Sequence, residues 1–501
     1  MFIKPTRSGG HTYLQLVESY RNEEGKTRQR TIATLGRLDE SGGGVDALLG
    51  GILRAKGLPA ATGASPQVAF ESALALGDVW ALDQLWKELG FDRLGAVFRK
   101  ARYTSAVEHA VRAMVFNRLC EPDSKLGVLR WLETVSLPGV DTASLTHQHL
   151  LRSMDALMNH QDAVDDALTA LLRPMVDQDL SLVFYDLTTI RAAGLSEQTD
   201  DVRQYGMSKE GLIARQFMLG VVQTAEGLPI YHEVFDGNQC ESATLLPTLK
   251  KVLGRFPHIK RLIVVADRGL LSIDIMEELS AIKLPSGQGL EFILAVPGRR
   301  YSEFADVLQA FGAKARLATD EIIEEVRWRD RRLVVAHHPH QAMEQTQLRN
   351  QRIAQLQVKA QAELMDGKLL LVTNVPELTP QQVVQRYKSL ADIERGFRVL
   401  KSEIEIAPVY HRLPERIRAH AMLCFMALII YRVMRQRLKM ANSELTPERA
   451  LAQLRRIQSH RVSINAAKPI AGISVINDQQ ASIYASLKVK KPAQDNQTTL
   501  L

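Results

Sequence analysis

Runs of consecutive apolar residues in the middle of the chain predict a buried β-sheet. Residues 182–185 and 262–266 are apolar throughout and have the length of strands. Such runs are typical of strands that are covered on both faces. Residues 217–222 and 230–235 flank a turn that contains Gly227, and this arrangement predicts a hairpin. A mixed sheet that includes an antiparallel pair is therefore expected here.

Helical spacing of the apolar residues alternates with these strands. Residues 242–256 and about 272–282 are spaced as helices, and residues 292–296 form another strand-like run. An order in which strands and helices alternate is typical of α/β domains. The Asp186 and Asp267 positions follow two of the apolar runs directly, so both are expected where their strands end.

A second part of the sheet is expected further along the chain, after an insertion. Residues 298–366 carry a predicted hairpin and a long polar helix rich in Gln and Arg, which we interpret as the insertion. Residues 369–373 then read as a strand that returns to the sheet. Thr379 is expected to cap one long helix that runs to about residue 404.

The N-terminal third has a different pattern. Polar and apolar residues alternate at 12–17 and 28–33 around a turn sequence, which predicts a β-hairpin, and residues 57–66 read as a linker. Asp78 precedes a helical pattern that stops at Gly90, and further helical runs cover 106–118 and 124–133. An all-helical module is expected after the linker.

These patterns predict an α/β protein in six consecutive segments. A mixed-sheet domain with a mostly β and helical insertion is preceded by a β-hairpin and an α-helical module. The expected boundaries are 1–66 for the hairpin region and linker, 67–178 for the helical module, 179–297 for the first part of the sheet domain, 298–367 for the insertion, 368–435 for the second part of the sheet domain, and 436–501 for basic helices and a disordered tail.

The composition is that of a globular protein in a reducing compartment. The chain is 46% hydrophobic and 24% charged. Its start lacks the apolar core of a secretory signal, and its longest apolar stretch, 421–431, is shorter than a membrane-spanning helix requires. Three cysteines without metal-binding spacing argue against a disulfide framework and a structural zinc site. A cytoplasmic location without membrane association is expected.

Positive charge is concentrated late in the sequence. The net charge is +7, and between Arg412 and Arg461 eleven Lys and Arg face three acids. This local excess of +8 is greater than the charge of the whole chain, so the remainder is close to neutral. A basic surface of this kind is commonly only solvated, but it also suits a nucleic-acid partner.

The two aspartates at strand ends are the first candidate site residues. Open α/β sheets place their ligand sites beyond the carboxyl ends of the strands. Either Asp186 or Asp267 alone is explained as well by a residue that caps the following turn. Two carboxylates at neighbouring strand ends, however, repel each other and call for a cation between them.

A third carboxylate is expected from the helix that follows Thr379. At about 100° per residue, one stripe of this helix carries Tyr387, Glu394, Arg398 and Lys401, and an adjacent stripe is apolar. The helix can therefore pack on the sheet while it presents an acid and two cations along the edge. An amphipathic helix with a Glu394–Arg398 pair explains the same pattern without any site.

A resemblance to a known family connects these three residues. The helix resembles the Tyr-x2-Arg-x3-Glu-x6-Lys signature of a large group of bacterial insertion-sequence transposases. Tyr387, Glu394 and Lys401 stand at the signature positions, while Leu390 stands at the Arg position and leaves Arg386 or Arg398 to substitute. Residues 185–189 resemble the first acidic motif of the group, and residues 265–269 resemble the second.

The resemblance implies a DDE transposase with an RNase H-like catalytic domain. It implies that Asp186, Asp267 and Glu394 are the catalytic residues and hold two divalent metal ions, Mg²⁺ or Mn²⁺. It also implies DNA or phosphate contacts by Tyr387, Arg398, Lys401 and Arg268. The partners implied are terminal inverted repeats and target DNA, bound by a homodimer in a nucleoid-associated complex, with residues 67–178 as the module that binds the DNA ends.

Two alternatives remain open from the sequence. A domesticated or inactive transposase would bind DNA without cutting it, and a stand-alone RNase H-like nuclease would cut without strand transfer. The intact acidic residues argue against the first, and the large N-terminal module argues against the second. His337, His338 and His340 offer a separate metal site, although a surface loop after a hairpin is the simpler interpretation.

Overall fold

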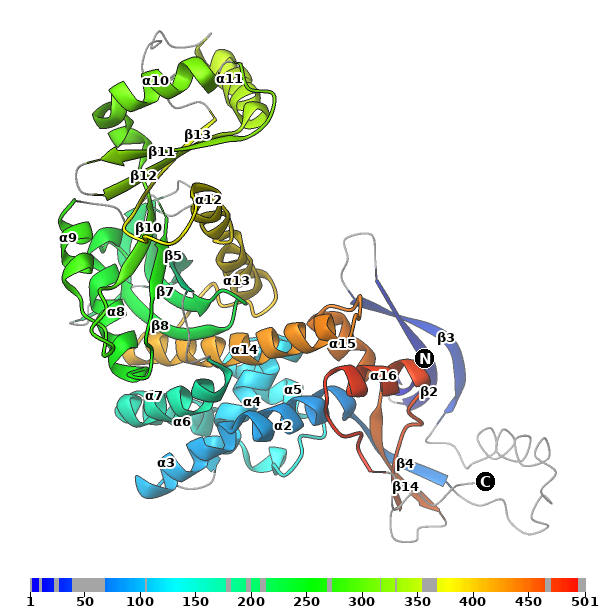
Figure 1. Ribbon diagram of the computed structural model, residues 1–501. Coiled ribbons are helices and arrows are strands. Elements are labelled where there is room, and N and C mark those ends of the chain that lie inside the picture. Colours follow the sequence, from blue (N-terminus) through cyan, green and yellow to red (C-terminus); the bar gives the residue numbers. More distant parts are fainter. Residues whose placement is uncertain are drawn as a thin grey trace. The chain divides into compact units, whose positions relative to one another are not determined.

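The protein is described by a computed structural model, in which the chain forms two compact units (Figure 1). The structure describes residues 2–8, 11–21, 27–37, 68–103, 106–176, 182–194, 200–207, 213–267, 273–315, 317–328, 331–353, 367–464 and 470–493. The larger unit comprises 89–122 and 148–433, and the smaller comprises 1–88, 123–147 and 434–501. Each unit is therefore assembled from separate segments of the chain, and the six consecutive segments stay a prediction.

The larger unit is built on one large mixed sheet. Its described strands are β5 (Leu182–Arg191), β6 (Gln204–Met207), β7 (Ile213–Thr224), β8 (Pro229–Asp236), β9 (Ile263–Ala266), β10 (Glu291–Ala295), β11 (Ile322–Trp328), β12 (Arg331–His337) and β13 (Lys368–Thr373). Their order is β11-β12-β13-β10-β9-β5-β7-β6, and β8 also pairs with β7. Strands β5, β9 and β10 are parallel, and their other neighbours are antiparallel. The mixed sheet with its β7–β8 hairpin confirms the predicted α/β class.

Strand β5 is longer than its apolar run. It continues to Arg191 because residues 183–191 pair with β7 along their whole length. Asp186 therefore lies in the middle of β5, and the prediction that the strand ends there was wrong. Strand β9 does end at Ala266, directly before Asp267, as predicted.

The predicted insertion is not separate from the sheet. Strands β11 and β12 form the expected hairpin, but β12 pairs with β13 and so extends the same sheet. Helix α10 (Ala305–Ala315) precedes the hairpin and was not predicted, whereas helix α11 (Pro339–Ile353) is the polar helix that was expected. The segment thus lengthens the sheet beyond β10.

Helices cover both faces of this sheet (Figure 1). Helices α8 (Leu245–Arg255) and α9 (Ile273–Ala281) lie on one face, and α12 (Pro380–Lys388) and α13 (Ala391–Ser402) lie on the other. Thr379 caps α12 in a capping box with Gln382, as predicted for the helix start. The single long helix that was expected is instead broken after Lys388. The Ser389 hydroxyl donates to the Gln385 carbonyl and Leu390 N–H donates to Tyr387, which makes a turn between the two helices.

The rest of the larger unit is helical. It contains α3 (Leu94–Lys100), α4 (Ala106–Cys120), α6 (His147–Asn159), α7 (Gln161–Leu172) and α14 (Pro414–Met440). Helix α14 is long and apolar enough to cross a membrane, with a mean hydropathy of 1.6 over its most apolar window. That window is 94% buried within the protein, which is the behaviour of a core helix.

The smaller unit holds two three-stranded sheets. The first is β1 (Phe2–Ser8), β2 (His11–Arg21) and β3 (Thr27–Arg37), in which β2 and β3 are the predicted hairpin. The second is β4 (Val68–Ala75), β14 (Gln458–Ile464) and β15 (Ile470–Ile473). Helices α2 (Gly77–Leu89), α5 (Lys125–Leu132), α15 (Pro447–Leu454) and α16 (Asp478–Ser486) complete the unit.

Two features of this unit test the N-terminal predictions. Helix α2 stops before Gly90, which has a φ of 89° that an L side chain rarely adopts, as the sequence predicted. Residues 68–75 form a strand, so the prediction of a module that is helical throughout was wrong there. The reason is long-range pairing with β14, which lies almost 390 residues later in the sequence. The predicted linker and most of the C-terminal tail lie outside the described residues.

Candidate active site

The sheet places Asp186 and Asp267 beside each other. Strands β5 and β9 are parallel neighbours, and Tyr185 is paired with Ala266. Asp186 and Asp267 are therefore the next residue of each strand, at a spacing of about 4.8 Å between strands. Asp186 is only 8% exposed, whereas Asp267 is exposed where β9 has ended. One carboxylate is buried in the sheet and the other lies at its rim.

Alternation along β5 decides which face receives Asp186. The Tyr185 hydroxyl donates to Thr244 just before α8, at 2.8 Å, and burial raises the pKa of this phenol above its usual range. Successive side chains of a strand point to opposite faces. Asp186 therefore faces away from α8, toward the face on which α13 contacts β5.

The break between α12 and α13 completes a pocket over these aspartates. A cavity of about 190 Å³ is lined by Asp186, Asp267 and Glu394 together with residues of the turn between the helices. The Tyr387 hydroxyl donates to Oδ1 of Asp267 at 2.8 Å, across 120 residues of sequence. Tyr387 belongs to α12 and Glu394 to α13, so they reach the pocket from two helices and not along one stripe.

The donors of this pocket suit a divalent cation. Three carboxylates supply the oxygen ligands that Mg²⁺ and Mn²⁺ prefer. In the part of the chain that the structure describes, no three His, Cys, Asp or Glu side chains form a ready metal-binding group. Carboxylates around one pocket repel each other until a cation offsets their charge. The residues therefore fit a cation by chemistry and by location.

Of the other residues that the sequence singled out, Arg398 and Lys401 lie outside the pocket. Arg398 is exposed and Lys401 partly exposed on α13, and neither lines the pocket. Arg268 lies outside the described residues. Leu390, at the signature position for Arg, lines the pocket and is 8% exposed, so an apolar side chain forms this wall.

Sequence reasoning missed Lys388. This residue lines the pocket, and its ammonium group contacts both carboxylate oxygens of Glu321 at 2.6 and 2.8 Å. On one continuous helix, Lys388 would lie beside the stripe that carries Tyr387 and Glu394 and not on it. Its position in the sequence therefore did not indicate a place in the pocket. Ser389, a residue that competes with helix hydrogen bonding, was the one local hint of the break that brings Lys388 to the pocket.

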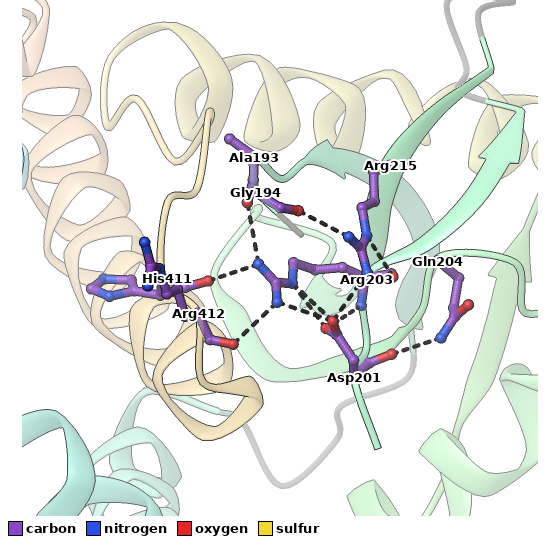
Figure 2. A network of polar contacts seen from close by, with 8 residues as sticks. All are labelled: Ala193, Gly194, Asp201, Arg203, Gln204, Arg215, His411 and Arg412. Atoms are coloured by element: carbon purple, nitrogen blue, oxygen red, sulfur yellow. Dashed lines mark hydrogen bonds and ion pairs between the residues drawn. The ribbon is translucent and has the colours of Figure 1, made fainter. Parts of the chain in front are cut away.

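A buried ion-pair network lies at the far end of β5 (Figure 2). The Arg203 side chain is fully buried and forms a bidentate pair with Asp201, with distances of 2.9 Å (Nε–Oδ1) and 3.0 Å (Nη2–Oδ2). Its remaining N–H groups donate to the carbonyls of Ala193, His411 and Arg412 at 3.1–3.2 Å. The guanidinium is thus surrounded by acceptors in the interior.

Arg215 of β7 adds a second cation to the same aspartate. It contacts Oδ2 of Asp201 at 3.3 Å and donates to the Gly194 carbonyl at 3.0 Å. Burial, the largest single influence, would raise the pKa of Asp201. Hydrogen bonds from Arg203 and the charges of both arginines outweigh it, so the pKa lies below its ordinary value of 3.8.

The network joins the end of β5, the strand that carries Asp186, to the segment that follows α13. The segment after α13 adds to the end of β5, because Val409 N–H donates to Arg191 and Ala193 N–H donates to Val409. Arg203 then holds residues 411–412 of that segment and residue 193 of the β5 extension with one side chain. The network therefore holds the end of β5 against the segment that connects α13 to α14.

The His337, His338 and His340 cluster has no metal-site geometry. The His338 and His340 rings lie 6.0 Å apart, and His337 is buried at the end of β12. Burial, and then the charges of Lys368 and His338, lower the pKa of His337. The surface-loop interpretation was wrong for His337, which ends β12, and for His340, which lies in the first turn of α11, so that only His338 lies in the connection between the two elements.

Comparisons with known proteins give two family matches. Residues 177–430, about half of the chain, match the transposase DDE domain. Residues 3–62 match the N-terminal domain of the IS1634 family of transposases. No curated protein matches the sequence. Among solved structures, the chain resembles a piggyBac transposase in a synaptic complex with hairpin DNA, with 9% identity, 70% of each chain covered and a TM-score of 0.41.

Proposed function

The chain belongs to the family of DDE transposases of insertion sequences, and from this membership we propose that it cuts DNA at the ends of an insertion sequence and transfers those ends into target DNA. The observation that carries the proposal is the pocket shared by Asp186, Asp267 and Glu394. We also propose that the sheet domain is RNase H-like, which the central place of β5 between an antiparallel hairpin and parallel strands supports.

The proposed chemistry is phosphodiester cleavage with divalent metal ions, which transposases of this family use. When bound, a divalent cation activates the attacking oxygen and stabilises the leaving oxygen of an in-line displacement. We propose that Asp186, Asp267 and Glu394 would together hold two Mg²⁺ ions, as the family resemblance implies. The same residues can serve a water or a DNA 3′-hydroxyl as the nucleophile, so one site can cut and join.

The side chains around the carboxylates have separate proposed roles. The Tyr387 hydrogen bond is proposed to hold the exposed Asp267 carboxylate in a fixed orientation. Arg398, Lys401 and Arg268 are proposed to contact DNA phosphates, as the family resemblance implies. Leu390 cannot make the contact expected of an arginine, and Lys388, the lysine that lines the pocket, is paired with Glu321.

The remaining assignments concern partners. DNA is the partner expected of a transposase, and we propose that a homodimer binds two ends together in a synaptic complex. Residues 1–178 are proposed to contain the module that recognises the ends without metal. The basic stretch from Arg412 to Arg461 supports additional contacts with the phosphate backbone.

A nicking and joining assay tests the proposed function. The full-length protein is incubated with a duplex that carries the inverted repeats flanking its coding DNA, with Mg²⁺ or with EDTA. Cleavage at the repeat ends and joining to a plasmid are expected only with Mg²⁺. Binding without cleavage would favour a domesticated protein, and cleavage without end preference or joining would favour a stand-alone nuclease.

Lys401 gives a test of the proposed phosphate contacts. Lys401→Ala is expected to slow single-turnover cleavage of a bound end by about 10- to 1000-fold, because an electrostatic contact near the scissile phosphate is lost. Arg395→Ala is the matched control, since it removes one cation from the same helix outside the proposed site. A cleavage rate equal to that of wild type in Lys401→Ala, with an unchanged melting temperature, would contradict the role.

A further inference from the structure

The first sheet of the smaller unit has two unlike faces. Paired residues of neighbouring strands point to the same side, so the register of β1, β2 and β3 assigns their paired residues to one face or the other. One face carries the buried Leu14 and an ion pair between Glu18 and Arg30. The opposite face, called the polar face below, is formed chiefly by Lys4, Thr6, Gln15, Arg21, Gln29 and Thr31, together with the buried Val17, which pairs with Thr31.

The polar face is a cationic and hydrogen-bonding surface. Lys4, Arg21, Gln29 and Thr31 are exposed. Of the side chains that the structure describes on this face, none is Asp or Glu. The only acid of these three described strands, Glu18, lies on the opposite face with its own arginine. A partner with negative charge and many hydrogen-bonding groups fits such a surface.

Hydrogen bonds across the strands order the two glutamines of the polar face. Lys4 Nζ donates to the Gln29 side-chain oxygen at 3.0 Å. The Gln15 side-chain oxygen accepts from Thr6 at 3.1 Å and from Thr31 at 3.3 Å. Each amide is therefore held by its oxygen, with a cation or hydroxyl beside it. Planar amides that are ordered before binding lose less entropy when they bind a second planar group.

The shape of the sheet suits a groove of duplex DNA. Strands β2 and β3 are each 11 residues long, and their pairing is interrupted by irregularities at Leu14/Gln15 and Leu16/Val17. Such bulges increase the twist of a strand pair. The major groove of B-DNA is about 12 Å wide and admits a two-stranded ribbon, which β2 and β3 can supply with Lys4 of β1 beside them. Gln pairs with adenine there, and Lys or Arg pairs with guanine.

We propose that the polar face of this sheet enters the major groove of duplex DNA and reads base sequence at the transposon ends. The proposal rests on the transposase function proposed above and assigns its end recognition to Gln15, Gln29 and Lys4. The base-reading side chains stand on neighbouring strands, and Arg21 lies at the rim of the same face for a phosphate contact.

Binding by the full-length protein without metal tests this assignment. Fluorescence anisotropy compares a duplex that carries the flanking inverted repeat with a shuffled duplex of the same composition. Gln29→Ala and Lys4→Ala are each expected to lower the preference for the repeat by about 5- to 100-fold, as expected for one lost base contact. Arg28→Ala is the matched control, because it is exposed next to Gln29 but on the opposite face.

The possible results distinguish failure of base reading by the polar face from failure of the proposed transposase function. Base reading by the polar face is overturned if both variants keep the wild-type preference for the repeat duplex over the shuffled duplex. It is also overturned if the variants lose the same affinity for both duplexes, even if wild type still cuts with Mg²⁺. Failure of wild type to cut counts against the proposed function instead. Gln29→Glu keeps the size of the side chain and guards against misfolding. With an unchanged melting temperature it is expected to lose repeat binding, and retained binding would overturn the proposal.

Discussion

Replacing Glu394 with glutamine is expected to abolish Mg²⁺-dependent cleavage, with a single-turnover rate at least about 1000-fold below that of wild type. Removal of one electrostatic contact from an active site commonly costs 100- to 1000-fold, and a metal ligand is expected to cost no less. Glutamine has nearly the size of glutamate but lacks its charge. Because Glu394 is exposed at the pocket, its loss is expected to leave folding and end binding almost unchanged.

Asp186→Asn and Asp267→Asn are expected to give the same loss for the same reason. The measurement is cleavage of a labelled end that is already bound, so that weak binding does not imitate slow chemistry. Glu403→Gln is the matched control, since it makes the identical substitution at the exposed C-terminus of α13. Wild-type rates in any of the three pocket variants would remove that residue from the proposed site.

Local patterns in the sequence predicted those parts of the fold that are held together by neighbours in the chain. The β7–β8 and β2–β3 hairpins were predicted because alternating residues and turn residues lie within a few positions of each other. The pairing of β4 with β14 was missed, because its partners lie far apart in sequence and a strand of eight residues gives no sign of a remote partner. Likewise, the hairpin of β11 and β12 was predicted, but not its addition to the main sheet.

In the candidate site, too, the features that follow from local patterns were predicted and those that depend on long-range contacts were not. Asp186 and Asp267 could be selected because each follows an apolar run, and the parallel pairing of β5 and β9 brings them together. The stripe argument selected Tyr387 and Glu394, although the helix that carried it is broken at Ser389. Tyr387 still reaches Asp267, and its hydroxyl donates to that carboxylate. The Lys388–Glu321 pair joins residues that are 67 positions apart in the sequence, so no periodic pattern could reveal it.

The buried network around Arg203 was equally invisible in the sequence. Asp201 and Arg203 are only two residues apart, but the acceptors that complete the guanidinium shell come from residues 193 and 411–412. A sequence pattern does not indicate which of 63 Lys and Arg side chains is buried. Among the residues that the structure describes, five Lys and Arg residues are buried, and the Arg203 side chain has no exposed surface.

Arg203→Ala is expected to be strongly destabilising, by about 3–5 kcal/mol, which is the usual cost of removing one partner from a buried ion pair. The change removes the bidentate partner of the buried Asp201 carboxylate, which keeps its contacts with Arg215 and with the backbone N–H of residue 203. It also removes the donor of three backbone carbonyls. Thermal and urea unfolding of the full-length protein measure the loss. Arg215→Ala is the matched control and is expected to cost less, because Arg215 is partly exposed and Asp201 keeps its bidentate partner.

Acid provides an internal check on the electrostatic origin of this effect. The pKa of Asp201 is lowered in the folded protein, so its pairing contributes stability that is fully present above the unfolded pKa of about 3.9 and is lost as pH falls through the lowered folded value. The stability difference between wild type and Arg203→Ala should therefore shrink as the pH is taken below about 4. If the difference is instead below about 1 kcal/mol at neutral pH, the network does not hold the end of β5 against the segment after α13. A large difference that does not change with acid would mean that the carbonyl contacts, and not the ion pair with Asp201, provide most of the stabilisation.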